Sequence, residues 1–554
     1  MSQSSSTEIN KGSGSIEPGF WNLRNKHNTF GLKGRKLRWA VTLTSVVGFS
    51  LFGYDQGLMS GIITAPQFQR DFPPVSGSSR HATVVQGIVT ACYEIGCFFG
   101  ALFAMIVGDR LGRRLLIIIG ATIIIIGTFI SIFPFRPHWQ LGHFIIARSV
   151  TGIGNGMNTA TIPVWQSEQS KPENRGRLVN LEGSVIAVGT LIAYWVDFGL
   201  SYANSSVSWR LPIALQILFA LFLLLSILGL PESPRWLISK GRMEEARYIL
   251  GSINDVDPND DGVIAESTMI ADAVNRFDNA QLGWRELFSG GKHQYFRRMM
   301  LGASAQFFQQ FTGCNASIYY ATVLFENTLD FARRKALVMG GIFSIVYAVF
   351  TIPSFFLIDR LGRRPLFLIG AAGQGVAFII AFGCLVKENA NNAKGAAVGL
   401  FLFIAFFAFT ILPLPWVYPP EINALRARTV ATSISTCTNW LSNFAVVMFT
   451  PIFINQSKWG CYLFFAIINF IYVPIIYFFY PETAGRSLEE IDIIFARSYD
   501  EGVPAFIVAN RMAKLNNQEL EAEGNRLGLF DMDDTKPSAE LNEGILEKPQ
   551  EPEV

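Results

Sequence analysis

Charged residues are scarce in this chain of 554 residues: 45 Lys and Arg with 43 Asp and Glu make up only 16% of it, against roughly a quarter in an average soluble protein. This shortage excludes an intrinsically disordered chain and a nucleic-acid-binding protein. Half of the residues are apolar, 47 of them are Phe, and the mean hydropathy is +0.31. Because a soluble surface is mostly polar, we expect a membrane protein that contacts the lipid bilayer.

The sequence also lacks the patterns of metal sites, disulfide frameworks and enzymes. We find no phosphate-binding loop, metal-ligand spacing or hydrolase nucleophile elbow, so we expect no enzyme activity and no cofactor. The first 38 residues have no apolar core and therefore no cleavable signal peptide. The six cysteines lie inside apolar stretches without paired spacing, and we interpret them as buried free thiols: Cys92, Cys97, Cys314, Cys384, Cys437 and Cys461.

Long apolar runs dominate the rest of the sequence and predict an all-α membrane protein with twelve transmembrane helices. Basic clusters before the first run and between even- and odd-numbered runs place both termini in the cytoplasm. The runs cover about 39–63, 84–107, 114–133, 142–165, 180–201, 211–230, 297–328, 335–358, 365–386, 396–420, 429–452 and 460–481.

A charged segment separates six of these runs from the other six. We therefore divide the chain into an N-terminal segment (1–38), a six-helix bundle (39–230), a cytoplasmic linker with short helices (231–296), a second six-helix bundle (297–481) and an acidic cytoplasmic tail (482–554). Residues 487–554 hold 16 Asp and Glu against 6 Lys and Arg. With little apolar periodicity, this tail is expected to be mostly disordered beyond its first turn.

Three motifs recur 250 to 253 positions later in the chain, which indicates a duplicated six-helix unit. Asp-Arg-Leu-Gly-Arg-Arg at 109–114 returns at 359–364, a Glu followed seven residues later by Arg returns 253 positions on, and Pro-Glu at 231–232 returns at 481–482. Gly112 and Gly362 allow a tight turn between spans. The paired charges are candidates for a cytoplasmic latch, the alternative being that they only set the topology: Asp109, Arg113, Glu168 and Arg175, then Asp359, Arg363, Glu421 and Arg428.

These loops, together with the segments 231–235, 309–315 and 481–486, resemble the sugar porter family of the major facilitator superfamily over about residues 35–495. The resemblance implies two parallel six-helix repeats that rock about a midplane binding site. A closer similarity, to yeast plasma-membrane glycerol/proton symporters of this family, extends through spans and loops at 49–59, 81–87, 162–168, 178–184, 193–202 and 437–451.

Charged residues inside the predicted spans are candidates for proton coupling. Asp55 lies deep in span one and Arg148 within span four. A carboxylate that exchanges a proton for an arginine partner supplies the chemistry of a symporter, and the resemblance assigns this role to the corresponding residues. A static buried ion pair is the alternative. Glu94 in span two and Glu182 near the start of span five are further acidic candidates that share or modulate the proton site.

Polar residues in span seven form a candidate substrate site. Gln309 and Asn315 lie close to two helical turns apart and share a face, and amides donate to and accept from hydroxyl groups. Asn443 lies one turn after Asn439, so it joins that site on geometry. The resemblance gives substrate-contacting positions to Gln309, Gln310, Asn315, Trp416 and Asn439, and Tyr319 extends the wall. Packing of helices through amides is the alternative.

Three positions depart from the pattern of the sugar-transporting members. Gly183 stands where they usually carry glutamine, Tyr347 where they carry asparagine, and Leu412 where they often carry glycine. Fewer amides and less room leave the hydroxyls of a hexose unpaired, at ~1–3 kcal/mol each. We expect proton-coupled symport of a small polyol, glycerol, at the plasma membrane. An uncoupled hexose or polyol facilitator and a non-transporting nutrient sensor are the alternatives.

Overall fold

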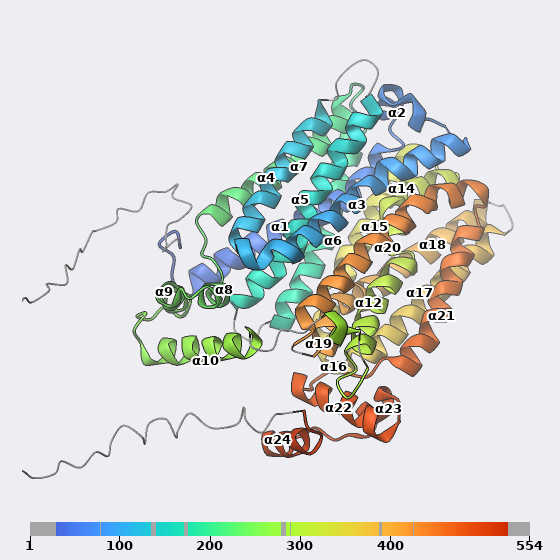
Figure 1. The fold of residues 1–554 in the computed structure, drawn as a ribbon. Coiled ribbons are helices and arrows are strands. Elements are labelled where there is room, and N and C mark those ends of the chain that lie inside the picture. The colour runs from blue at the N-terminus through green and yellow to red at the C-terminus, as the bar shows by residue number, and fades with distance from the viewer. Residues whose placement is uncertain are drawn as a thin grey trace, which may run out of the picture.

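The computed structural model describes residues 29–77, 79–133, 140–170, 175–278, 284–288, 290–386, 390–424 and 426–529. Within these residues every regular element is a helix. Two bundles stand side by side, the first in blue to green and the second in yellow to red (Figure 1).

The N-terminal bundle holds six long helices, with the short helices α2 and η1 following α1. Gly112 separates α3 from α4 without a linker. The helices are α1 (Gly34–Ile62), α2 (Pro66–Asp71), η1 (Pro73–Val75), α3 (Arg80–Leu111), α4 (Arg113–Ile132), α5 (Gln140–Glu168), α6 (Arg175–Leu200) and α7 (Val207–Leu228).

The C-terminal bundle repeats this arrangement with more broken helices. Gly313, at φ +97°, interrupts the predicted seventh span, which forms α12 (Tyr295–Phe311), α13 (Cys314–Tyr319), α14 (Ala321–Val323) and η3 (Leu324–Thr328). The remaining helices are α15 (Arg333–Phe350), α16 (Ser354–Leu361), α17 (Arg363–Leu385), α18 (Ala390–Phe406), η4 (Phe407–Ile411), α19 (Leu414–Ile422), α20 (Arg428–Gln456) and α21 (Gly460–Phe479).

All twelve predicted apolar runs lie on these helices. Of the described helices, eight are long and apolar enough to cross a membrane, and the bent pair α15 and α16, at 45°, makes nine. The other three runs fall on α1, α5 and the broken α12 to η3, which carry buried polar side chains such as Asp55, Arg148 and Gln310. Large apolar side chains remain exposed along the long helices, as expected of a surface in contact with lipid.

The linker forms helices beneath the N-terminal bundle, as the sequence predicts. They are α8 (Pro234–Ser239), α9 (Met243–Asn254), α10 (Asp261–Asp278) and α11 (Trp284–Leu287). α9 packs against α1, and Arg38 donates to the carbonyl of Ile253 at 2.9 Å.

The prediction of a mostly disordered tail is wrong for residues 488–526. They form α22 (Leu488–Glu501), α23 (Ala505–Arg511) and α24 (Asn517–Arg526), at the same end of the molecule as α8 to α10 (Figure 1). Capping boxes begin α22 and α24. Arg298 of α12 pairs with Asp492 at 2.6 Å. The acidic composition misled the prediction because a few apolar residues of α22 and α23 are enough to pack these helices against the bundle, among them Ile491, Ile494, Phe495 and Val508.

Charges within the tail also hold its helices together. Arg526 and Arg497 both bond the Glu523 carboxylate and lower its pKa to about 2.

All six cysteines are free, as predicted, although Cys384 and Cys437 are partly exposed rather than buried.

Candidate functional site

A buried ion pair joins α1 to α5 in the middle of the N-terminal bundle. Arg148 contacts the two carboxylate oxygens of Asp55 at 2.6 and 3.2 Å, and the two side chains are 1% and 2% exposed. The Tyr93 ring lies 4.9 Å from the guanidinium. Because the cost of desolvating two charges offsets much of their attraction, a buried ion pair is weak evidence for stabilisation of the fold. Charged residues inside membrane spans are typical of functional sites.

Gln216 of α7 completes this site and was not predicted from the sequence. Its Nε2 donates to Asp55 Oδ1 at 2.5 Å, and its Oε1 accepts from Thr128 of α4 at 3.3 Å. A single glutamine in an apolar run is weak evidence for a functional site, although Gln216 is the only residue of α7 with an amide side chain. Asp55 therefore accepts a hydrogen bond from a neutral donor in addition to those from Arg148.

Glu94 of α3 is fully buried and bonds across the two halves to the hydroxyl of Tyr319 on α13. Its other oxygen, Oε2, has no partner among the described residues. Tyr319 was predicted to line the substrate site, but it contacts Glu94 and not the central cavity. Glu182 of α6 is buried, and among the described residues it makes no hydrogen bond or ion pair with Asp55, Glu94 or Arg148.

A small central cavity lies between the halves. The volume open to a water-sized sphere is about 20 Å³, little more than one such sphere requires. Five of the predicted substrate residues line it together with Tyr347: Gln309, Gln310, Asn315, Trp416 and Asn439.

The amides of the cavity form a network. Asn315 donates to Gln310 at 2.8 Å and to Asn443 at 2.9 Å, and Asn439 donates to Gln309 at 3.0 Å. Asn443 thus supports the cavity without lining it. The polar groups are held in place by one another, which preorganises them for a hydroxylated ligand.

Gln56 of α1 is a second residue that sequence reasoning missed. It lines the cavity from the N-terminal half, and its Oε1 is buried without a hydrogen-bond partner among the described residues. Its position next to Asp55 could have identified it. Neighbouring residues of a helix point about 100° apart, so Asp55 and Gln56 face different surroundings. One turn of α1 therefore presents a proton-binding group to the bundle interior and an amide to the cavity.

Two of the three departures from the sugar-porter pattern line this cavity, and the third lies next to Leu412. Tyr347 and Leu412 line it. A Cβ on Gly183 would lie 3.8 Å from Leu412 Cγ, so a larger side chain at 183 would approach the same wall. The ring of Tyr347 also packs on Phe407, with centroids 6.0 Å apart.

The repeated charge motifs form matching clusters at the end of the bundles that carries the linker and tail helices. Arg113 bonds Glu168 at 3.1 and 3.2 Å and Asp109 at 3.1 Å. Arg363 bonds Glu421 at 3.1 and 2.7 Å and Asp359 at 3.1 Å. Each cluster joins helices of one half and does not bridge the two halves. That these charges latch the bundles in one state and separate in the other stays a prediction.

Of the two arginines predicted to complete the clusters, only Arg428 can be placed, and it lies outside its cluster. The side chain of Arg175 lies outside the described residues. Arg428 donates to the Asn423 carbonyl at 3.4 Å, and in the described residues it forms no ion pair with Glu421.

Two further carboxylates, Glu232 and Glu482, complete the clusters. Glu232 accepts from the backbone of Arg113 at 3.1 Å, and Glu482 accepts from that of Arg363 at 2.9 Å, so they cap the starts of α4 and α17. A Cβ on Gly112 or Gly362, both at positive φ, would lie 2.6 or 2.5 Å from these carboxylates. The repeated Pro-Glu motif is the feature of the sequence that indicated Glu232 and Glu482.

The halves contact each other at the opposite end. Ser60 of α1 bonds Thr322 of α14 at 3.1 Å and accepts from Tyr194 of α6 at 3.0 Å. Arg333 of α15 donates to the Thr64 carbonyl. The central cavity is therefore closed at this end.

Comparison with known proteins assigns the family. The family model described as "Sugar (and other) transporter" matches residues 40–495. The chain belongs to the sugar porter family of the major facilitator superfamily. It is a multi-pass membrane transporter and not an enzyme.

This sugar porter is similar to proteins of fungi and bacteria along almost its whole length. It is 61% identical over 505 residues to the sugar transporter STL1 of Saccharomyces cerevisiae, covering 91% of this chain and 89% of that one. It is 54% identical over 508 residues to the major facilitator superfamily transporter mfsA of Aspergillus fumigatus, covering 90% and 94%.

A solved structure shows the same fold. The proton:xylose symporter XylE of E. coli, bound to 6-bromo-6-deoxy-D-glucose, is 26% identical to this sugar porter, with a TM-score of 0.70 over 83% of this chain and 99% of that one. The chain is therefore an all-helical membrane protein with the major facilitator fold.

Proposed function

We propose that this sugar porter is a twelve-span, proton-coupled symporter of glycerol in the plasma membrane, with both termini in the cytoplasm. The buried Asp55–Arg148 pair carries the proposal. A carboxylate that releases its proton regains the arginine as partner, and one that is protonated frees it. Gln216 stabilises the carboxyl in both states.

The free energy released when one proton enters the cell is large enough to drive accumulation of the substrate. One charge at ~100 mV supplies ~2.3 kcal/mol, and two pH units supply about 2.7 kcal/mol. Together, ~5 kcal/mol corresponds to a several-thousandfold gradient of substrate in the absence of leaks. Proton symport by XylE, as its name states, supports coupling in this family.

Two bulky side chains at the cavity wall support glycerol as the substrate. The ring of Tyr347 and the side chain of Leu412 occupy space at its wall. The remaining amides offer donors and acceptors to a few hydroxyls, whereas a hexose would bury hydroxyls without partners.

The deciding experiment records external pH in weakly buffered, de-energised cells that express the protein. Addition of glycerol is expected to make the medium alkaline, because protons enter with the substrate, and addition of glucose is not. Alkalinisation by glucose alone, or by neither compound, would contradict the proposal.

Substitution of Gln56 by Ala is expected to raise the KM for glycerol about 2- to 12-fold, the range for one lost hydrogen bond of ~0.5–1.5 kcal/mol, with the proton-to-glycerol ratio unchanged. The matched control is Gln374→Ala on α17, a fully buried glutamine outside the cavity whose amide has no partner among the described residues. Equal effects of the two variants on KM would show that Gln56 does not contact substrate.

Tyr319→Phe is expected to reduce glycerol uptake about fivefold or more, because it leaves the buried Glu94 carboxyl without its bond across the halves, at ~1–3 kcal/mol. Tyr320→Phe is the control, since that hydroxyl donates to the Val447 carbonyl within one half at 3.0 Å. Initial rates of labelled glycerol uptake, normalised to surface expression, measure both. Similar rates for the two variants would argue against a role for the Glu94 contact.

A further inference from the structure

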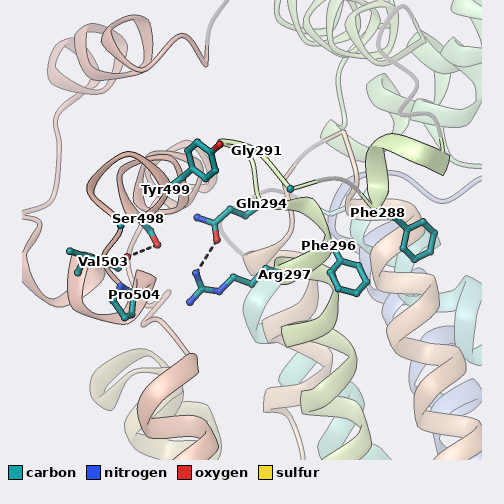
Figure 2. Close-up of a pocket in the computed structure, with 11 residues that line it drawn as sticks. Phe288, Gly291, Gln294, Phe296, Arg297, Ser498, Tyr499, Val503 and Pro504 are labelled. Carbon is teal, nitrogen blue, oxygen red and sulfur yellow. Dashed lines mark hydrogen bonds between the residues drawn. The ribbon is translucent and has the colours of Figure 1, made fainter.

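A groove of about 490 Å³ lies between the start of α12 and the tail helices, away from the central cavity. One wall is the segment from Phe288 to Arg297. The other wall is the end of α22 and the start of α23, including Tyr499 and Pro504. Figure 2 shows the tail residues on one side, Phe288 and Phe296 on the other, and Arg297 between them.

Arg297 is a partly buried cation without a counter-charge. Its Nη1 donates to the neutral Oε1 of Gln294 at 2.9 Å (Figure 2), and no ion pair joins it to a carboxylate within the described part of the chain. The next residue, Arg298, pairs with Asp492 at 2.6 Å. Because a guanidinium is always charged and its planar donors match phosphate oxygens, Arg297 is placed to bind an anion.

An apolar face continues from the groove along α12. Phe296, Met300 and Phe307 are 42%, 48% and 36% exposed. Their spacing of four and seven residues keeps them on one side of the helix. Since α12 begins the first span of the C-terminal bundle, this face is in contact with the hydrocarbon of the bilayer.

We propose that the groove binds an anionic phospholipid, with the headgroup phosphate on Arg297 and an acyl chain along Phe296, Met300 and Phe307. The charge of Arg297 selects the headgroup, and the adjoining apolar face distinguishes a lipid from a free anion. A lipid held here contacts α12 and the tail helices together, so it also stabilises the docking of the tail. The proposal is independent of which substrate the transporter carries.

Native mass spectrometry of the full-length, delipidated protein tests the proposal with phosphatidylglycerol, phosphatidylcholine and inorganic phosphate as probes. We expect retention of phosphatidylglycerol above phosphatidylcholine. Arg297→Gln is expected to lower the affinity for phosphatidylglycerol about fivefold, the factor for one basic residue at an anionic surface. Phe296→Asn is expected to weaken lipid retention while the protein keeps its charge.

The control is Arg80→Gln, an exposed arginine at the start of α3, at the opposite end of the bundle. Elution as a single species in size exclusion shows that each variant is folded. Equal loss of lipid in Arg80→Gln and Arg297→Gln, or no loss in either, would overturn the proposal. Displacement of the lipid by millimolar phosphate, with Phe296→Asn without effect, would overturn it in favour of a site for a soluble anion.

Discussion

Asp55→Asn is expected to reduce the accumulation of glycerol from several-thousandfold to equilibration across the membrane. The amide keeps the size of the side chain and its hydrogen bond from Gln216, but it neither binds nor releases a proton. Arg148 then loses its charged partner in every state of the cycle, and the free energy of the proton gradient no longer reaches the substrate.

The measurement is the steady-state ratio of internal to external labelled glycerol, with and without a protonophore. The variant is expected to be insensitive to the protonophore, whereas the unmodified transporter loses its gradient. Asp197→Asn serves as the control, because Asp197 is a buried carboxylate of α6 that makes no contact with Arg148. Sustained accumulation by Asp55→Asn would show that the proton binds elsewhere, with Glu94 the next candidate.

The combined substitution of Gly183 by Gln and Tyr347 by Asn is expected to admit hexoses. It restores two amides at the cavity and removes the Tyr347 ring from its wall. At ~0.5–1.5 kcal/mol for each hydrogen bond gained, competition by glucose for glycerol uptake should strengthen about tenfold or more.

The control for this change is Tyr347→Phe, which keeps the ring and should leave glucose excluded. Inhibition constants for glucose against glycerol uptake measure the effect. Thermal unfolding in detergent checks that the cavity left beside Phe407 has not destabilised the protein. Failure of glucose to compete with the double variant, when it is folded and still carries glycerol, would show that selectivity resides elsewhere.

The repeat shows how much the sequence could predict. Because the two Asp-Arg-Leu-Gly-Arg-Arg loops have the same local geometry, with glycine at φ +88° and +93°, they build matching clusters with Glu168 and Glu421. Local interactions of this kind can be predicted from the spacing of residues along the chain. The tail was misjudged because the composition of residues 487–554 as a whole is acidic, whereas α22 and α23 depend on a few apolar residues and pack against α19 and α21.

Polarity and breaks also distinguish the helices of the candidate site. The three predicted spans on α1, α5 and the broken α12 to η3 are not among the long, apolar helices, and they carry Asp55, Arg148 and the span-seven amides. Placing a polar group in a membrane helix costs free energy, so such groups are rare and easy to recognise in the sequence. What they bind is a separate question that the sequence left open.

The sequence by itself determined the class of protein, the duplicated bundle and most residues of the site, because hydropathy, topogenic charge and repeated motifs are local properties of the chain. Only the tertiary structure decided which polar groups meet. Asp55 binds Arg148 and Gln216 across 93 and 161 residues, and Glu94 binds Tyr319 across 225. Such pairings depend on how helices are rotated and packed against one another, and no spacing along the chain encodes that rotation.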